Sequence, residues 1–348
     1  MNIMLNNCPS TLAEGFETYS DAAAGSLFDG QVVSPFLDFD LNANKLSEAV
    51  SEALNRISVS GVQEKFAAVI KNGRICIADN GERSTHILKP SPWDATISFR
   101  HEIPANENLT MQIAAQVYGI DVAPNGLCFS KNGKAVYITK RFDVAADGTK
   151  YLMEDFSTVV GRGEAVDGKH FKYDGCYAEI ADAIRRASSD VDGDLMKFFK
   201  ILVFNYIHAN GDAHLKNFSL IHDDRGRAVL APAYDLINTS LHVKDSDFAL
   251  DGGLSPEIEK SDVYLRTGHP CRLDFERFGS HIGLSEDNVG KVLDCFMDVP
   301  QLSKTLILNS FLTQRMKRTY LRIVSERVSR FVRREESEKY FAKSTLKI

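Results

Sequence analysis

The chain has 348 residues, of which 44% are hydrophobic and 25% are charged. This is the composition of an ordinary globular protein, long enough for one large domain or two moderate ones. No apolar run approaches the roughly 18 residues of a membrane span, and the N-terminus lacks the basic region and apolar core of a signal peptide. The net charge of −6 argues against broad binding to nucleic acid. We therefore expect a cytoplasmic protein with no membrane contact and no direct nucleic-acid binding.

The six cysteines and nine histidines show no spacing typical of a metal site. No two cysteines form a C-x-x-C pair, so a structural zinc site is not expected. The cysteines are spread through segments that read as core, which suits reduced thiols in a cytoplasm.

The first part of the chain is predicted to be rich in strands. Residues 1 to about 40 are poorly periodic, and apolar residues four positions apart predict a helix over 41–55. Short apolar runs separated by turn signals predict strands, and a second helical pattern follows them. The predicted strands are 66–70, 74–78 and 85–90, followed by a helix over 107–118 and a hairpin over 126–142.

From about residue 143 the pattern becomes helical, with helices over 177–187 and 195–208. Short strands follow at 218–221 and 228–231, then a loop-rich stretch to about 275. A last helix is predicted from about 302 to 340. The sequence therefore predicts an α+β, bilobal fold like that of protein kinases, with a strand-rich N-terminal lobe (1–142) and a helical C-terminal lobe (143–348).

The stretch from Asn210 to Asn217 carries the strongest functional signal. An Asp followed five positions later by an Asn is the catalytic-loop spacing of protein kinases and aminoglycoside-type phosphotransferases. In that chemistry the Asp reaches the acceptor hydroxyl and the Asn turns back to hold magnesium. The bare spacing also fits a polar turn with two capping side chains. The predicted helix–loop–strand setting favours phosphoryl transfer, and Asp235 lies where such an enzyme places its second metal-binding Asp.

The groups that would contact phosphates precede this loop. Ser58, Ser60 and Gly61 lie just before the first hairpin strand, where a phosphate-covering loop is expected. An ordinary turn with capping serines is the alternative. Lys89, at the end of the third strand, is placed to pair with nucleotide phosphates, with Glu107 as its partner. A solvent-facing lysine and a glutamate at a helix N-terminus are the alternatives.

Two further positions have a weaker signal. Phe142 ends the strand-rich lobe, where backbone groups would meet an adenine ring, although a core phenylalanine of an edge strand fits equally well. His214 lies inside the predicted catalytic loop and is able to order it through a hydrogen bond. A lone histidine is more often structural than an acid or a base.

Together these segments resemble the HipA-like serine/threonine kinases, the toxin components of bacterial toxin–antitoxin modules. The resemblance covers about residues 40–330. Its most specific motifs are S-G-x-Q-E-K, beginning at Ser60, and D-x-H-x-K-N, beginning at Asp212. The matching segments are 58–65, 85–90, 106–108, 139–143, 154–155, 211–219 and 232–236.

The resemblance implies that Asp212 is the catalytic base and that Asn217 and Asp235 hold Mg²⁺. It places Lys89 on the phosphates of ATP. It also places Lys140 and Phe142 at the adenine-binding hinge. It implies, finally, that Ser58 and Ser60 are autophosphorylated with loss of activity, since a phosphate there adds about −1.5 to −2 charge.

The resemblance thus implies an ATP- and magnesium-dependent kinase toxin, with an aminoacyl-tRNA synthetase as the suggested substrate. Too little chain precedes residue 41 to form the N-terminal subdomain of long HipA proteins. The chain therefore resembles the short HipT-type kinases, whose missing subdomain is encoded as a separate small protein. The resemblance implies antitoxin partners, a small HipS-like protein and a DNA-binding HipB-like protein, and leaves open which of the two neutralises the kinase. Two alternatives remain open: a small-molecule phosphotransferase of the aminoglycoside type, and a catalytically silent binding module.

Overall fold

The computed structural model describes residues 4–41, 64–145 and 148–332, and it divides into two compact units that interleave along the chain. Unit 1 consists of Met1–Leu152, Pro232–Lys244 and Pro300–Leu321. Unit 2 consists of Met153–Ala231, Asp245–Val299 and Arg322–Ile348. The predicted division between residues 142 and 143 falls ten residues before the first change of unit. The prediction had one boundary, whereas two later segments of the chain return to unit 1.

Unit 1 contains a five-stranded antiparallel sheet with the strand order β2-β1-β3-β5-β4. Asn72 and Gly73, between β1 and β2, both have positive φ, the conformation that a two-residue hairpin turn requires. The predicted strands are confirmed, with ends shifted by at most two residues. The strands are β1 (Phe66–Lys71), β2 (Arg74–Ile77), β3 (His86–Lys89), β4 (Asn125–Phe129) and β5 (Ala135–Lys140).

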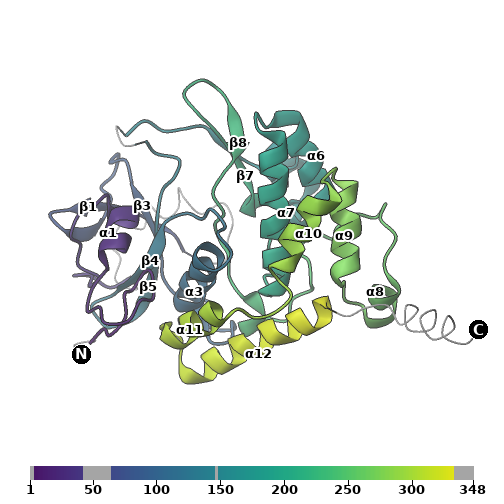
Figure 1. Ribbon diagram of the computed structural model, residues 1–348. Coiled ribbons are helices and arrows are strands. Elements are labelled where there is room, and N and C mark those ends of the chain that lie inside the picture. The colour runs from purple at the N-terminus through teal and green to yellow at the C-terminus, as the bar shows by residue number, and fades with distance from the viewer. Residues whose placement is uncertain (1–3, 42–63, 146–147, 333–348) are drawn as a thin grey trace, which may run out of the picture. The chain divides into compact units, whose positions relative to one another are not determined.

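Different helices cover the two faces of this sheet, because successive side chains of a strand point to opposite faces. On one face Gly126 and Cys128 of β4 meet α1 (Asp21–Phe28). On the other, Asn125 faces α3 (Ile103–Gln116), which lies beside β4 and β5 in Figure 1. Helix α1 falls in the stretch predicted to be irregular. It is short, and its start depends on the Ser20 side chain, which accepts a hydrogen bond from the backbone of Ala23.

Helix α3 begins one turn earlier than predicted. Pro104 occupies its first turn, where the missing backbone N–H of proline is not needed. The prediction placed Glu107 at the helix N-terminus, and this is wrong. Glu107 lies in the second turn, where its side chain is buried.

The long helix predicted over about 302–340 is two helices, α11 (Gln301–Asn309) and α12 (Gln314–Phe331). The break begins at Ser310, whose backbone is extended and whose hydroxyl donates to the carbonyl of Ile307 at 2.8 Å. Helix α11 packs against α3. Helix α12 begins in unit 1 and ends in unit 2. In unit 1 the hydroxyls of Tyr320 and Thr110 lie 3.0 Å apart and join α12 to α3.

Unit 2 combines a small antiparallel sheet, in the order β6-β7-β8, with a group of helices. Helix α7 packs against α6, α10 and β8, and α10 packs against α9. The strands are β6 (Met153–Asp155), β7 (Ser219–His222) and β8 (Ala228–Leu230). The helices are α4 (Phe156–Val159), α5 (Glu164–Asp167), α6 (Tyr177–Ala187), α7 (Val191–Ile207), α8 (Asp262–Thr267), α9 (Arg272–His281) and α10 (Glu286–Asp294).

Most elements of unit 2 confirm the predictions. Helix α6 has the predicted ends, and both short strands are present. Helix α7 begins four residues before the predicted start, because Asp190 accepts a hydrogen bond from the backbone of Gly193 and caps the helix there. The stretch predicted to be loop-rich to about residue 275 is confirmed, and within it lie the short α8 and the start of α9.

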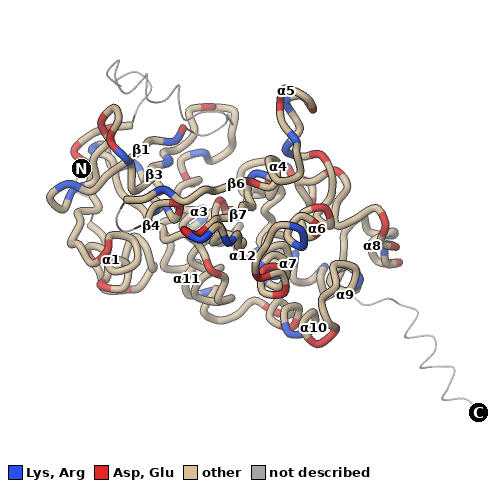
Figure 2. The backbone as a smooth tube through the Cα atoms, turned by 90° about the horizontal axis from the view of Figure 1, so that it is seen from above, with Lys and Arg blue, Asp and Glu red and all other residues tan. Residues whose placement is uncertain are grey.

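Acidic and basic positions are interspersed along the described part of the chain in both units (Figure 2). None of the described helices is long and apolar enough to cross a membrane. Within the same residues, no three His, Cys, Asp or Glu side chains gather as a metal site would require. The six cysteines are all free thiols, and Cys295 is exposed.

Candidate active-site residues in the two units

Unit 1 brings together three of the predicted site residues. Lys89, at the end of β3, forms an ion pair with Glu107 of α3 at 2.7 Å and a second ion pair with Asp235. Lys89 and Glu107 are only 5% and 3% exposed. Burial alone lowers the pKa of Lys89, but the carboxylates of Asp235 and Glu107 outweigh it, so the net effect is to raise that pKa. Lys89 is therefore an ammonium ion held in a fixed position.

Asp235 is held in an unusual backbone conformation, with φ of +55°. This left-handed region is costly for a residue other than glycine and marks sites where the surrounding structure fixes the chain. A bridge between Val122 and Ala233 fastens the preceding residues to unit 1. The Nζ of Lys65 lies 3.9 Å from the second carboxylate oxygen of Asp235. Two cations therefore meet this one carboxylate.

A network of buried side chains holds the segments that carry Glu107 and Asp235 together. The side chain of Asn106, next to Glu107 on α3, donates to the backbone carbonyl of Asn238 at 2.9 Å and accepts from the backbone of Asn238 at 3.3 Å. Asn106 also contacts the imidazole of His242 at 2.9 Å. The network ties the segment after Asp235 to α3. These contacts could not be predicted from the sequence, because no local pattern connects positions so far apart.

Unit 2 holds the predicted catalytic loop, which hydrogen bonds order from within. The backbone of His214 donates to the carbonyl of Asp212 at 2.8 Å and to the side-chain oxygen of Asn217 at 3.1 Å. The backbone of Asn217 donates in turn to the carbonyl of His214 at 2.9 Å. The last three residues of the loop, Leu215–Asn217, form a 3₁₀ turn. These bonds hold Asp212 and Asn217 in one rigid segment.

Neighbouring segments of unit 2 fix the loop from outside. The phenol of Tyr177 donates to the carbonyl of Ala213 at 2.9 Å. Gly211 lies so close to the next segment that a Cβ atom there would come within 2.3 Å of the Cβ of Asp245 and 2.7 Å of the carbonyl oxygen of Ser246. Only glycine fits at this point of the loop.

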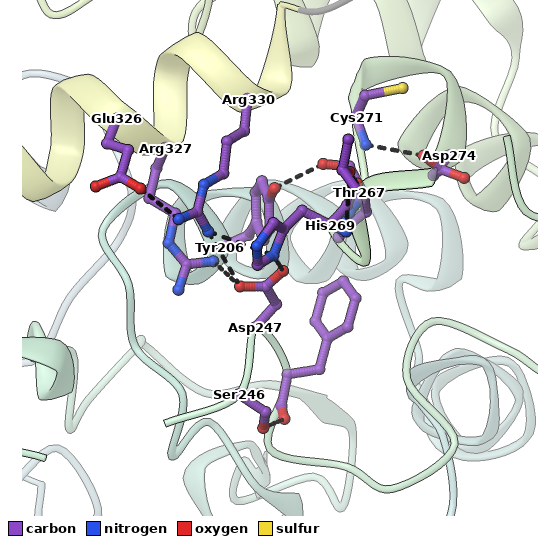
Figure 3. Close-up of polar contacts among 12 residues, drawn as sticks. Tyr206, Ser246, Asp247, Thr267, His269, Cys271, Asp274, Glu326, Arg327 and Arg330 are labelled. Atoms are coloured by element: carbon purple, nitrogen blue, oxygen red, sulfur yellow. Dashed lines mark hydrogen bonds and ion pairs between the residues drawn. The ribbon is translucent and has the colours of Figure 1, made fainter. Parts of the chain in front are cut away.

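The segment that covers Gly211 is itself anchored through Asp247. Its carboxylate accepts from His269 at 2.7 Å, forms an ion pair with Arg327 and lies 3.8 Å from Arg330 (Figure 3). Both arginines come from α12. The C-terminal part of α12 thus holds the segment that packs on the predicted catalytic loop.

Tyr173 is a further residue for which the sequence predicted no role. It ends the 3₁₀ turn Phe171–Tyr173, and its phenol donates to Oδ1 of Asp212 at 2.8 Å. The two residues are 39 positions apart, and no sequence motif joins them.

Of the remaining predicted residues, Lys140 and Phe142 lie at and just after the end of β5. The Nζ of Lys140 forms an ion pair with Asp29 at 2.5 Å, and the ring of Phe142 packs against that of Tyr234 at 5.7 Å. Ser58, Ser60 and Gly61 lie outside the described residues, as does most of the helix predicted over 41–55.

The donor chemistry of these residues fits ATP and magnesium. Mg²⁺ prefers oxygen ligands, which the carboxylate of Asp235 in unit 1 and the amide of Asn217 in unit 2 provide. An amide oxygen has two lone pairs, so the bond that Asn217 accepts from His214 is compatible with metal binding. In unit 1 the ammonium groups of Lys89 and Lys65 suit the negative charge of phosphates.

His208 gives a prediction about stability. It follows α7, is fully buried, and stacks on Phe204 with ring centroids 4.2 Å apart. Burial lowers the pKa of His208 to about 3, whereas an unfolded chain has a value of about 6.5. The unfolded chain therefore binds the proton first, and stability present above about pH 6.5 is lost as the pH falls. We expect this group to remove about 2 kcal/mol from the free energy of unfolding between about pH 7.5 and about pH 5.

Denaturant unfolding of the wild type and His208→Gln at the two pH values tests this expectation. Glutamine does not titrate, so the variant should lose less stability than the wild type on acidification. Burial also lowers the pKa values of His86 and His242, but these residues are common to both proteins and cancel in the comparison. An equal loss of stability in the two proteins would contradict the role given to His208.

The fold and these residues define the class of protein. An antiparallel sheet that carries a buried lysine–glutamate pair, with a helical unit that carries an ordered Asp-x-x-x-x-Asn loop, is an α+β, kinase-like fold. The structure is similar to HipA of Shewanella oneidensis in its complex with HipB and operator DNA, with a TM-score of 0.60 and 18% sequence identity. The match covers 84% of this chain and 68% of that chain. At this identity the likeness concerns the fold.

The chain belongs to the HipA-like family, because the model of the HipA-like C-terminal domain matches residues 57–302. The predicted family resemblance is thus confirmed. The chain is 33% identical over 193 residues to the putative kinase Y4mE of Sinorhizobium fredii, covering 53% of this chain and 43% of that protein. It is 24% identical over 294 residues to a putative kinase of Haemophilus influenzae, covering 79% of this chain and 80% of that protein.

The serine/threonine-protein kinase toxin HipA of Shewanella oneidensis is 24% identical to this chain over 226 residues, a match that covers 60% of this chain and 49% of the toxin. The chain spans about half the length of the Sinorhizobium relatives and of this toxin.

Proposed function

We propose that the chain is an ATP- and magnesium-dependent serine/threonine kinase. The observation that carries the proposal is the ion triad of unit 1, in which Lys89 is paired both with the buried Glu107 and with the partly exposed Asp235. Burying the two charged groups of Lys89 and Glu107 costs free energy, and their pairing is weak evidence for a gain in stability. The kinase-like fold indicates a function for this pair, which is to hold the ammonium group of Lys89 in a fixed position for binding phosphates. The ordered Asp212–Asn217 loop of unit 2 supports the same chemistry.

In this proposal each of the predicted residues has its own task. Lys89 pairs with phosphate oxygens, and Glu107 keeps its ammonium group in position. Asp212 accepts the proton of the acceptor hydroxyl, and His214 orders the loop through its backbone. Asn217 and Asp235 hold magnesium, which when bound neutralises negative charge on the phosphates. Lys140 and Phe142 line the adenine side, and Ser58, Ser60 and Gly61 cover the phosphates.

We further propose that the kinase is the toxin of a toxin–antitoxin module. The support is family membership and the similarity to a HipA toxin whose structure was solved with HipB and operator DNA. By this analogy the partners are antitoxin proteins, either a small HipS-like protein or a DNA-binding HipB-like protein. The substrate is another protein, with an aminoacyl-tRNA synthetase as the first to test, and the place of action is the cytoplasm.

Intact mass spectrometry after incubation with ATP and magnesium tests the kinase. The protein is first treated with a phosphatase, which is then removed, so that existing phosphates do not hide the reaction. We expect the mass to rise by one or two phosphates, located on Ser58 or Ser60. Chelation of magnesium with EDTA should prevent the rise, and so should the double change Ser58→Ala with Ser60→Ala.

Other results would select the alternatives. Transfer of phosphate to an added aminoglycoside, with none to any protein, would replace the proposal with a small-molecule phosphotransferase. An absence of ATP binding by the folded chain would replace it with a silent binding module.

A further inference from the structure

The contact between Tyr173 and Asp212 links two distant parts of unit 2. The phenol donates to Oδ1 of Asp212 at 2.8 Å, and its ring meets the imidazole of His214 edge-on, with centroids 5.3 Å apart. Burial and the neighbouring carboxylate of Asp212 raise the pKa of Tyr173. The phenol therefore keeps its proton near neutral pH and acts as a hydrogen-bond donor to Asp212.

Two backbone hydrogen bonds fix the chain around Tyr173 on one side. They come from the segment that follows Asp245 and Ser246, the residues that pack on Gly211. The backbone of Asp251 donates to the carbonyl of Tyr173 at 3.0 Å, and that of Gly252 donates to the carbonyl of Gly175 at 2.8 Å. The phenol is therefore attached to a segment that is tied to the surroundings of the catalytic loop.

Arg162 fixes the same segment from the other side. Its guanidinium donates to the carbonyl of Asp174 at 2.8 Å and pairs with Glu179 of α6 at 2.6 Å. Gly175 has φ of +94°, and a Cβ atom there would lie 2.5 Å from this guanidinium, so the clamp requires glycine. Between Arg162 and Tyr173 the chain makes an excursion with α5 at its tip (Figure 2). The contacts of Arg162 with Asp174 and Glu179 hold the two ends of this excursion together. They thereby keep the phenol of Tyr173 beside Asp212.

We propose that Tyr173 is a positioning residue, which fixes the orientation of the Asp212 carboxylate and favours its charged form. The inference rests on the proposed kinase function, in which Asp212 is the base. A carboxylate accepts several hydrogen bonds, so the phenol on Oδ1 is compatible with an acceptor hydroxyl. A donated hydrogen bond stabilises the charged carboxylate, and a fixed orientation removes the need to order the base in each reaction.

Tyr173→Phe tests the proposal, because it keeps the ring against His214 and removes only the hydroxyl. We expect kcat to fall about tenfold while the KM for ATP stays unchanged. The acidic limb of the pH profile of kcat/KM should move upward by about one pH unit. The matched control is Tyr206→Phe, which removes a buried phenol of the same unit that donates to the carbonyl of Pro270 at 2.6 Å. The control should lose stability without a shift of the acidic limb.

A second measurement does not depend on activity. Aspartate labelled with ¹³C at the carboxyl group reports the titration of Asp212 by NMR, with Asp212→Asn to assign the signal. We expect Asp212 to titrate at higher pH in Tyr173→Phe than in the wild type. An unshifted titration, an unshifted acidic limb or faster transfer by Tyr173→Phe would overturn the positioning role. A wild-type chain that transfers no phosphate, yet shows the shifted titration in the variant, would overturn the kinase proposal instead.

Discussion

Asp212→Asn is expected to slow phosphoryl transfer by about 10²–10⁴-fold, the contribution typical of a general base. The asparagine has nearly the same shape, and its amide oxygen still accepts the hydrogen bond that Tyr173 donates to Oδ1. The loop should therefore keep its structure, while the amide cannot accept the proton of the acceptor hydroxyl. Steady-state transfer to the protein substrate or to the chain itself measures the loss, and calorimetry should show ATP affinity within about threefold of the wild type.

The matched control is Asp223→Asn, in the same unit. Asp223 lies in the turn between β7 and β8 and pairs with Arg227 at 2.7 Å, away from the loop. This variant should transfer phosphate at the wild-type rate. If Asp212→Asn retained most of the wild-type rate, Asp212 would not be the base.

Lys89→Met is expected to remove both stability and activity. The substitution leaves the buried carboxylate of Glu107 without its cation and takes one of two cations from Asp235. Breaking a buried pair in this way costs about 3–5 kcal/mol of unfolding free energy. Phosphoryl transfer should fall by about 10²–10³-fold, because a fixed charge on the phosphates is lost. Denaturant unfolding and transfer rates measure the two effects.

A double variant separates the two effects. Adding Glu107→Gln to Lys89→Met removes the unpaired buried charge, so part of the lost stability should return while transfer stays low. Lys71→Met is the control, because Lys71 of β1 pairs at the surface with Asp79 and Glu82, and such pairs contribute little to stability. Recovery of transfer together with stability in the double variant would show that Lys89 acts only as a structural residue.

The strands, and the position of the Asp212–Asn217 loop between a helix and a strand, could be predicted because their signals are local. The turn at Asn72 and Gly73 needs positive φ at both positions, and asparagine followed by glycine is the pair of residues that most readily adopts it. The spacing from Asp212 to Asn217 is local because, in phosphoryl transfer, one short loop must present the Asp to the acceptor hydroxyl and the Asn to magnesium. The pairing of Lys89 with Glu107 was also predicted, and the structure places the two 2.7 Å apart.

The parts that could not be predicted depend on contacts distant in sequence or on single caps. The bond between Tyr173 and Asp212 spans 39 residues, and that between Asn106 and Asn238 spans 132. Periodicity carries no information about such pairs. The break between α11 and α12 depends on one serine within a continuous helical pattern. The ion pair of Asp235 with Lys89 exists because two segments of unit 1 far apart in the chain meet.

The interleaved order of unit 1 has a consequence for the nascent chain on the ribosome. At about 5–20 residues per second, Leu321 is synthesised roughly ten to thirty seconds after Leu152. During this interval α3 has neither α11 nor the hydroxyl of Tyr320 to pack against. For the first part of it, Lys89 and Glu107 also lack Asp235. A growing chain therefore cannot complete the packing of α3 until translation has passed most of the length described here.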